Sequence, residues 1–413
     1  MAGAVGFRSK IVNPKLLVLA IILGFFDGAD LSSMGVTLSR LSKNLELSPG
    51  QAGLCASASL VGVVIGATVG GRWADRKGRR PVLLTSALAL GIFAVLTAVA
   101  WDFPSLLVVR LLAGLGMGGL FPVLIAAARA SAVPDFRSTA ISIVMASGPV
   151  GALATALVGL APDYHWVFLF GGIGPLVAIP AILMVVRPGS EDAAPAPGAS
   201  GVPMRTVFFG EGRLVGTVLI WVIAFCTILV SYVLINWLPS MLQLQGFSRR
   251  EAGIAAVVYS VGGIFGNLVA GRAMDRGMPR TGFVVSYVGI MACLLGLSMI
   301  TQAFWMFVVA FGANLFVLGA QLVAMSLTAS FYPDEGRTTG LGAMVAAGRV
   351  GSVVGPLLTG LLLSAGLQAE SVMLLMLPGL ALSLVIGLAL TRAVRRRHVA
   401  GAGTVAAPQA ATH

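Results

Sequence analysis

Long apolar stretches alternate with short polar connections along the whole chain. Stretches of roughly 20 residues, long enough to cross a bilayer as helices, recur twelve times. Strands of a membrane barrel would be shorter and would alternate apolar with polar residues, so helices are expected. The pattern predicts an all-α integral membrane protein with twelve transmembrane helices. Their expected ranges are 16–38, 52–71, 82–100, 105–127, 139–161, 166–186, 214–237, 252–271, 282–300, 304–327, 339–364 and 370–391.

Composition supports the same class. Of 413 residues, 57% are hydrophobic and only 10% are charged, which leaves too few polar groups to cover a soluble globule. The cysteines, Cys55, Cys226 and Cys293, all lie within predicted spans. Neither a disulfide framework nor a metal site is indicated, and no cofactor is expected.

The net charge of +12 follows the topology of the predicted helices. With both termini in the cytoplasm, most Lys and Arg residues fall in the N-terminal tail, the inner loops and the C-terminal tail. The basic residues on the outer side are Arg40, Lys43, Arg249 and Arg250. This positive-inside bias accounts for the charge without a nucleic-acid partner.

An internal repeat organises the chain. The stretch GRWADRKGRRP at 71–81 recurs as GRAMDRGMPRT at 271–281, and PDFRSTA at 134–140 resembles PDEGRTTG at 333–340. Parallel repeats of this kind place a substrate site between two halves near the middle of the membrane. We therefore expect two pseudo-symmetric six-helix halves. The predicted divisions are an N-terminal half at 1–186, a Pro- and Gly-rich cytoplasmic linker at 187–212, a C-terminal half at 213–391 and a cytoplasmic tail at 392–413.

Four charges lie well inside predicted spans: Asp27, Asp30, Arg110 and Arg349. Each would cost about 2.5–3.5 kcal/mol at the bilayer centre, so we expect them to face a wet cavity or one another. The two aspartates project from one face of their helix, about 60° apart. Gly28 between them leaves room for another helix or a ligand.

The repeat makes these charges more informative. Their counterparts in the opposite half are uncharged: Thr227, Val230, Ala310 and Pro149. Maintenance of the fold would tend to place similar residues in both halves, so charges in one half alone favour a specific site. The alternative is a set of buried ion pairs that only orders the helices.

The motifs resemble those of a known family, and the resemblance covers essentially the whole chain. Twelve helices in two halves and GRWADRKGRR between helices 2 and 3 are similar to the major facilitator superfamily, and RLLAGLGMGG at 110–119 resembles a second motif of that family. Within it, DGAD at 27–30, NWLPSMLQLQGFS at 236–248 and GRVGSVVGP at 348–356 resemble the aromatic acid:proton symporters.

The resemblance implies a monomeric secondary transporter in a bacterial inner membrane. Such a protein imports an aromatic carboxylate of the benzoate or hydroxybenzoate type with a proton, by alternating access, and supplies aromatic hydrocarbon catabolism. The buried charges agree with this expectation. Two Asp and two Arg sum to zero, and binding one anion together with one proton restores that balance, so joint loading is favoured. We expect Asp27 and Asp30 to carry the proton, with Asp30 the more important, and Arg110 and Arg349 to bind the carboxylate.

Few other polar or aromatic residues in the spans suit an aromatic acid. Stacking on the ring and hydrogen bonding to its hydroxyl groups call for Tyr or Trp and Asn or Gln side chains. The candidates are Tyr232, Asn236, Trp237, Asn314 and Gln321. The alternative roles are an interfacial aromatic belt and packing between helices.

The loop between helices 2 and 3 is expected to form an inner gate. Asp75 stands among basic residues and recurs as Asp275, in a position to accept hydrogen bonds from a helix N-terminus and to pair with Arg. Charges that only set topology would explain the basic residues but not the repeated acid. The candidate gating residues are Gly71, Asp75, Arg76, Gly78, Arg79, Arg80 and Asp275.

Two alternatives stay open. A major facilitator exporter or a porter of another small organic acid or drug would share the fold, and GPVGALATALVG at 148–159 partly resembles an antiporter motif. A membrane receptor or enzyme is the other alternative. The sequence contains no HExxH motif, phosphate-binding loop or intramembrane histidine, so we expect no enzyme activity.

Overall fold

The computed structural model describes residues 10–186, 204–210, 213–275, 279–333 and 336–405, and these are almost entirely helical. Twelve helical segments are long and apolar enough to cross a membrane, which confirms the predicted number. The α-helices are α2 (Pro14–Asn44), α3 (Pro49–Lys77), α4 (Arg79–Ala98), α5 (Phe103–Ala130), α6 (Arg137–Val158), α7 (His165–Val177), α8 (Ile179–Val185), α9 (Met204–Phe209), α10 (Leu214–Leu244), α11 (Arg249–Asp275), α12 (Pro279–Met299), α13 (Ala303–Phe331), α14 (Arg337–Ser364), α15 (Ala369–Leu374) and α16 (Leu377–Val405).

Most helices extend beyond the apolar stretches that predicted them. The first begins where the Asn13 side chain accepts a hydrogen bond from the Leu16 backbone, and it ends at Asn44 rather than at 38. Capping at Ser48 and Asp102 likewise starts α3 and α5 ahead of their apolar residues. Hydropathy detects only the part of a helix that lies in lipid, so polar end turns escape it.

Two predicted spans consist of two helical pieces. The sixth is divided into α7 and α8 at Ala178, and the twelfth into α15 and α16 at Leu375 and Met376. Pro180 and Pro378 follow these breaks. Proline lacks a backbone N–H and disfavours helical conformation in the residue before it, so each break has a local cause.

Part of the predicted linker is ordered helix. Residues 187–203 and 211–212 lie outside the described residues, but α9 occupies Met204–Phe209. Val207 is buried, and the Phe208 ring packs edge-on against Trp221 of α10. The described end of the predicted linker therefore packs against the C-terminal half.

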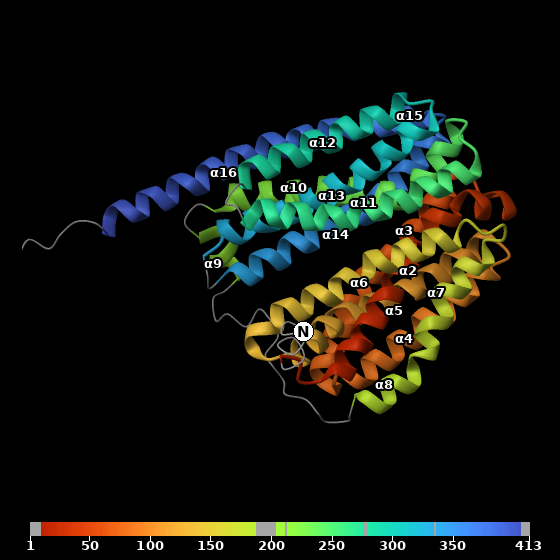
Figure 1. The fold of residues 1–413 in the computed structure, drawn as a ribbon, viewed down its shortest axis with the longest axis horizontal. Coiled ribbons are helices and arrows are strands. Elements are labelled where there is room, and N and C mark those ends of the chain that lie inside the picture. Colours follow the sequence, from red (N-terminus) through yellow and green to blue (C-terminus); the bar gives the residue numbers. More distant parts are fainter. Residues whose placement is uncertain (1–9, 187–203, 211–212, 276–278, 334–335, 406–413) are drawn as a thin grey trace, which may run out of the picture.

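The helices lie in two groups of six spans (Figure 1). In the first, α3 packs on α5 and α2 on α6; in the second, α11 packs on α13 and α10 on α14. These pairings are repeat counterparts of one another. The observed fold is therefore the predicted one, two pseudo-symmetric halves of six membrane-spanning helices.

Glycines allow the helices to approach closely. A Cβ atom at Gly28 of α2 would lie 2.1 Å from the Gly148 carbonyl oxygen of α6, inside van der Waals contact. The sequence allowed either another helix or a ligand beside Gly28, and in the structure the neighbour is another helix. Small residues that bring helix backbones together are typical of membrane bundles.

We expect Gly28→Ala to lower the melting temperature of the purified protein. The added methyl group meets backbone, which cannot rotate away, and strain of this kind costs roughly 1–3 kcal/mol. Gly342→Ala is the matched control, because no atom lies within 4 Å of a Cβ atom at Gly342. Equal melting temperatures for the two variants would contradict the close α2–α6 contact.

Contacts between the two halves gather at one end of the molecule. There the Gln243 side chain donates to Ser39 Oγ at 3.0 Å, and the Gly50 backbone donates to Ser364 Oγ at 2.7 Å. A Cβ atom at Gly35 of α2 would lie 1.9 Å from the carbonyl oxygen of Ile235 on α10. This is the end predicted to face outward, where α2 ends and α11 begins.

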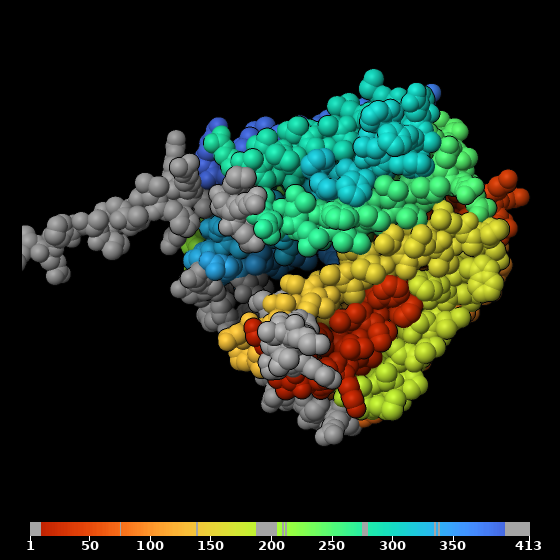
Figure 2. Space-filling view, in the orientation of Figure 1, coloured from red at the N-terminus to blue at the C-terminus, as the bar shows by residue number. Residues whose placement is uncertain are grey.

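The opposite end is open. Gly71, near the end of α3, and Gly342, near the start of α14, both have free space where a Cβ atom would stand. Figure 2 shows a hollow at this end, between the yellow α6 of one half and the green α11 and blue α14 of the other. The structure is therefore closed at the predicted outer end and open at the predicted inner end.

Candidate transport site

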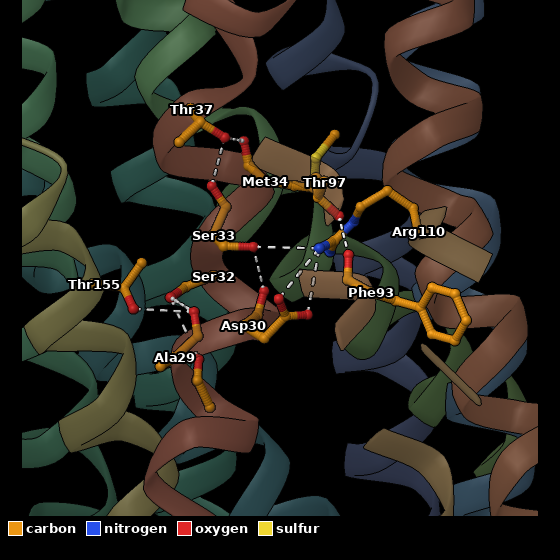
Figure 3. Close-up of polar contacts among 11 residues, drawn as sticks. Ala29, Asp30, Ser32, Ser33, Met34, Thr37, Phe93, Thr97, Arg110 and Thr155 are labelled. Carbon is orange, nitrogen blue, oxygen red and sulfur yellow. Dashed lines mark hydrogen bonds and ion pairs between the residues drawn. The ribbon is translucent and has the colours of Figure 1, made fainter. Parts of the chain in front are cut away.

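Asp30 and Arg110 form an ion pair inside the N-terminal half (Figure 3). Arg110 Nη1 lies 3.3 Å from both carboxylate oxygens of Asp30 and 3.4 Å from Ser33 Oγ. Asp30 has no exposed surface, and Arg110 is 1% exposed. The pair joins α2 to α5, about four turns before the end of α2 at Asn44.

This pair is sealed on almost every side. Ser33 Oγ donates to the Asp30 carbonyl at 2.7 Å, and a Cβ atom at Gly171 of α7 would lie 3.9 Å from Asp30 Oδ1, so α7 packs against the Asp30 carboxylate. Within the described part of the chain, Arg110 Nε has no hydrogen-bond partner. Removing either member would strand the other charge in a dry environment, at a cost of about 3–5 kcal/mol.

Asp27 has a different environment, one helical turn closer to the open end. It is only partly buried, and the charges acting on it are Arg349 of the C-terminal half and Asp30 of its own helix. Arg349 Nη1 donates to the hydroxyl of Tyr232 at 3.3 Å. The structure thus brings two predicted site residues, Arg349 and Tyr232, into contact, and the Arg349 charge acts on Asp27 of the other half.

Phe121 completes this group and was not predicted. The guanidinium carbon of Arg349 lies over the Phe121 ring, 5.7 Å from its centroid, so an α14 cation meets an α5 ring across the interface. The repeat could have indicated Phe121, because its counterpart in the other half is Gln321, a predicted site residue. Without that comparison, a single Phe in an apolar helix cannot be distinguished from a packing residue.

The other predicted substrate residues lie apart from this group or make helix contacts. Trp237 is 3% exposed and its indole N–H donates to the Pro356 carbonyl at 3.1 Å, within the C-terminal half. Asn236 donates to the Tyr232 carbonyl of its own helix, and Asn314 donates to the Tyr259 carbonyl of α11. Gln321 is half-buried on α13.

The predicted inner gate lies at the junction of α3 and α4. Gly78 adopts a φ of 92°, a conformation that glycine accepts readily, and it separates the two helices. Gly71 lies on α3 beside open space, Arg76 is exposed, Arg79 begins α4, and Arg80 donates to the Leu183 carbonyl of α8 at 3.3 Å. The side chains of Asp75 and Asp275 lie outside the described residues, so the gate stays a prediction.

Among the residues that the structure describes, no three His, Cys, Asp or Glu side chains come close enough to hold a metal ion. The chemistry available is that of two carboxylates, two guanidinium groups, a phenol and an aromatic ring. These groups suit reversible binding of an anion and a proton.

Comparison of the sequence with known proteins gives consistent results. The 3-(3-hydroxy-phenyl)propionate transporter of Escherichia coli (strain K12) is 37% identical over 387 residues, which cover 92% of this chain and 93% of that protein. The gentisate transporter of Corynebacterium glutamicum is 31% identical, covering 96% and 95%. The 4-hydroxybenzoate transporter PcaK of Pseudomonas aeruginosa is 29% identical, covering 87% and 88%.

Solved structures share the fold at lower identity. The D-xylose-proton symporter superposes with a TM-score of 0.73 and 17% identity, covering 90% of this chain and 96% of that one. An inward-facing, unoccupied bacterial homolog of the human lysosomal transporter Spinster gives a TM-score of 0.72 and 18% identity, covering 93% and 98%.

A family model places both halves of the chain in one group. The model described as the Major Facilitator Superfamily matches residues 20–249 and again 220–412, in accord with the internal repeat. The relatives of this chain named above are transporters rather than enzymes. The chain is therefore a multi-pass membrane transporter that belongs to the major facilitator superfamily.

Proposed function

We propose that this protein imports an aromatic carboxylate together with a proton by alternating access. The observation that carries the proposal is the group formed by Asp27, Arg349, Tyr232 and Phe121, because it joins an acid, an anion-binding fork and an aromatic ring across the interface. The printed names of its relatives, transporters of hydroxyphenylpropionate, 4-hydroxybenzoate and gentisate, support this substrate class.

The Asp30–Arg110 ion pair and the charges of Asp27 and Arg349 have separate roles in this proposal. The Asp30–Arg110 pair is sealed and neutral, so it maintains the shape of the N-terminal half. Asp27 and Arg349 are only partly buried, and each comes from a different half. When a carboxylate occupies Arg349, Asp27 loses its counter-charge and takes up a proton. Neutrality then favours joint loading of anion and proton, which is symport.

The open end identifies the side of the membrane that the central site faces, and we propose import because an inward proton gradient would drive a symported acid into the cell. The hollow lies at the end where the chain begins and where α16 extends past the spans (Figures 1 and 2). Basic residues concentrate at this end, so the positive-inside bias makes it cytoplasmic. We propose a bacterial inner membrane location, both termini in the cytoplasm, and rocking of the halves 1–186 and 213–391 about the central site.

Uptake into proteoliposomes tests the proposal. Labelled 3-(3-hydroxyphenyl)propionate, 4-hydroxybenzoate and gentisate would be offered with and without an inwardly directed proton gradient. We expect at least one acid to accumulate above its external concentration only with the gradient, and a protonophore to abolish the accumulation. Accumulation that requires an outwardly directed gradient would favour an exporter, and equal uptake without any gradient would exclude proton coupling.

Replacement of Phe121 by leucine should weaken binding of aromatic acids. Aromatic contacts contribute about 0.5–1.5 kcal/mol beyond buried area, so we expect a loss of roughly two- to tenfold in affinity. Affinity for cyclohexanecarboxylate, which has no π face, should change less than affinity for benzoate. Competition against a labelled substrate measures both.

Phe265→Leu is the matched control for this prediction. Phe265 is exposed on α11, and its ring packs against Phe311 at 6.0 Å between ring centroids, whereas the ring over which Arg349 lies is that of Phe121. Equal losses for benzoate and cyclohexanecarboxylate in Phe121→Leu would show that Phe121 fills space without recognising the aromatic ring.

A further inference from the structure

The end of α6 carries a set of backbone carbonyls that accept hydrogen bonds from side chains. The helix ends at Val158, and the turn that follows leads to Pro162. The last carbonyls of any helix lack N–H partners and carry partial negative charge. Here these oxygens lie at the closed end of the molecule, beside the other half.

Two arginines bind these carbonyls, one from each half. Arg40 of α2 donates to Gly159 O at 2.9 Å and to Ala161 O at 3.0 Å. Arg249, the first residue of α11, donates to the same Ala161 O at 2.7 Å. It also reaches the carbonyls of Leu160 and Pro162, both at 3.4 Å.

The first turn of α11 holds Arg249 in place. The Ser248 backbone donates to Glu251 Oε2 at 2.8 Å, and the Glu251 backbone donates to Ser248 Oγ at 3.3 Å, a reciprocal cap. The Glu251 carboxylate is therefore engaged with the cap. Arg249 points instead across the interface to the end of α6.

Packing beside Arg249 reinforces the contact. A Cβ atom at Gly253, one turn along α11, would lie 2.8 Å from Leu160 Cδ2, so the absence of a side chain admits Leu160. At the repeat counterpart, Gly53, a Cβ atom would lie 2.8 Å from the Pro356 carbonyl oxygen of α14. Close packing at these glycines thus occurs in both halves, but the counterpart of Arg249 is Pro49, which cannot make the arginine contact.

The two arginines differ in what opening would do to them. Arg40 and α6 belong to the same half, so their hydrogen bonds persist when the halves separate at this end. Arg249 belongs to the other half, and its hydrogen bonds must break. We propose that Arg249 is a gating residue that holds the outer end closed by binding the carbonyl end of α6, and so sets the balance between outward-open and inward-open carriers.

Distance measurements between spin labels test this proposal. Trp101 and Thr301 are exposed at the outer ends of the two halves and are repeat counterparts, so labels on cysteines at these positions report the outer opening. Cys55, Cys226 and Cys293 would be replaced by alanine. In nanodiscs without substrate, Arg249→Ala should raise the ratio of long to short distances roughly three- to tenfold. This is the change in population that corresponds to the free energy of one hydrogen bond.

Arg250→Ala is the matched control, because Arg250 is the exposed neighbour of Arg249 and carries the same charge. It should leave the distances at their wild-type values, and Arg249→Lys should restore part of the closed population. Arg40→Ala should lower the melting temperature more than it shifts the distances. Identical distance distributions for Arg249→Ala and Arg250→Ala would overturn the proposal, as would a lower melting temperature in Arg249→Ala with unchanged distances.

Discussion

Replacing Arg349 by alanine is expected to lower the affinity for a carboxylate substrate roughly 10- to 100-fold. The guanidinium group lies at the interface between the halves, where it contacts the Tyr232 hydroxyl and the Phe121 ring. Its charge also acts on Asp27. A charge-assisted hydrogen bond to a carboxylate contributes about 1.5–3 kcal/mol, which gives that range. Arg349→Lys should recover part of the loss, because it keeps the charge without the fork.

An uncharged analogue separates this effect from loss of folding. Wild-type protein should prefer benzoate to benzamide, whereas Arg349→Ala should bind both weakly and to a similar degree, with an unchanged melting temperature. If Arg349→Ala discriminates between them as the wild type does, the anion site lies elsewhere. Arg110 would then be the candidate, since its Nε has no hydrogen-bond partner in the described part of the chain.

The number of helices and the repeat were predictable because they depend on quantities that a sequence displays directly. Apolar length detects a membrane span whatever its surroundings. The register between the halves follows from GRWADRKGRRP and its second copy, and it also relates Phe121 to Gln321. The same register relates the exposed positions Trp101 and Thr301.

The pairing of the four buried charges was not predictable. Their depth limited them to a cavity or to one another, but partner choice depends on how each helix is rotated. The spans are apolar around most of their circumference, so amphipathicity does not reveal which face is inward. Only the structure pairs Asp30 with Arg110 and places Asp27 near Arg349.

The role of aromatic residues was equally hard to predict from the sequence, because it also depends on how each helix is rotated. Trp237 and Phe121 both occur in apolar helices, yet one is packed within the C-terminal half and the other faces a guanidinium group of the opposite half. Residue type alone favoured Trp237, because its ring is larger and polar at one edge. Its N–H is bonded to Pro356, and its ring is almost fully buried, so the geometry favours Phe121 for contact with a substrate.

The largest functional effect is expected from neutralising the two aspartates one at a time. Asp27→Asn should abolish accumulation driven by a proton gradient, because the residue can no longer load and release a proton. Exchange of labelled for unlabelled substrate should persist and lose its dependence on pH, since Asn resembles the protonated acid and exchange needs only the loaded carrier. Uptake and exchange in the same proteoliposomes measure both activities.

Asp30→Asn should behave differently, although sequence alone gave Asp30 the larger part in proton coupling. The change leaves Arg110 buried without its counter-charge, so we expect both activities to fall together and stability to drop by about 3–5 kcal/mol. Adding Arg110→Gln should restore stability, because no charge is then stranded. If Asp30→Asn instead loses accumulation and keeps exchange, Asp30 carries the proton, and if the Asp27→Asn, Asp30→Asn double variant still accumulates substrate, neither aspartate does.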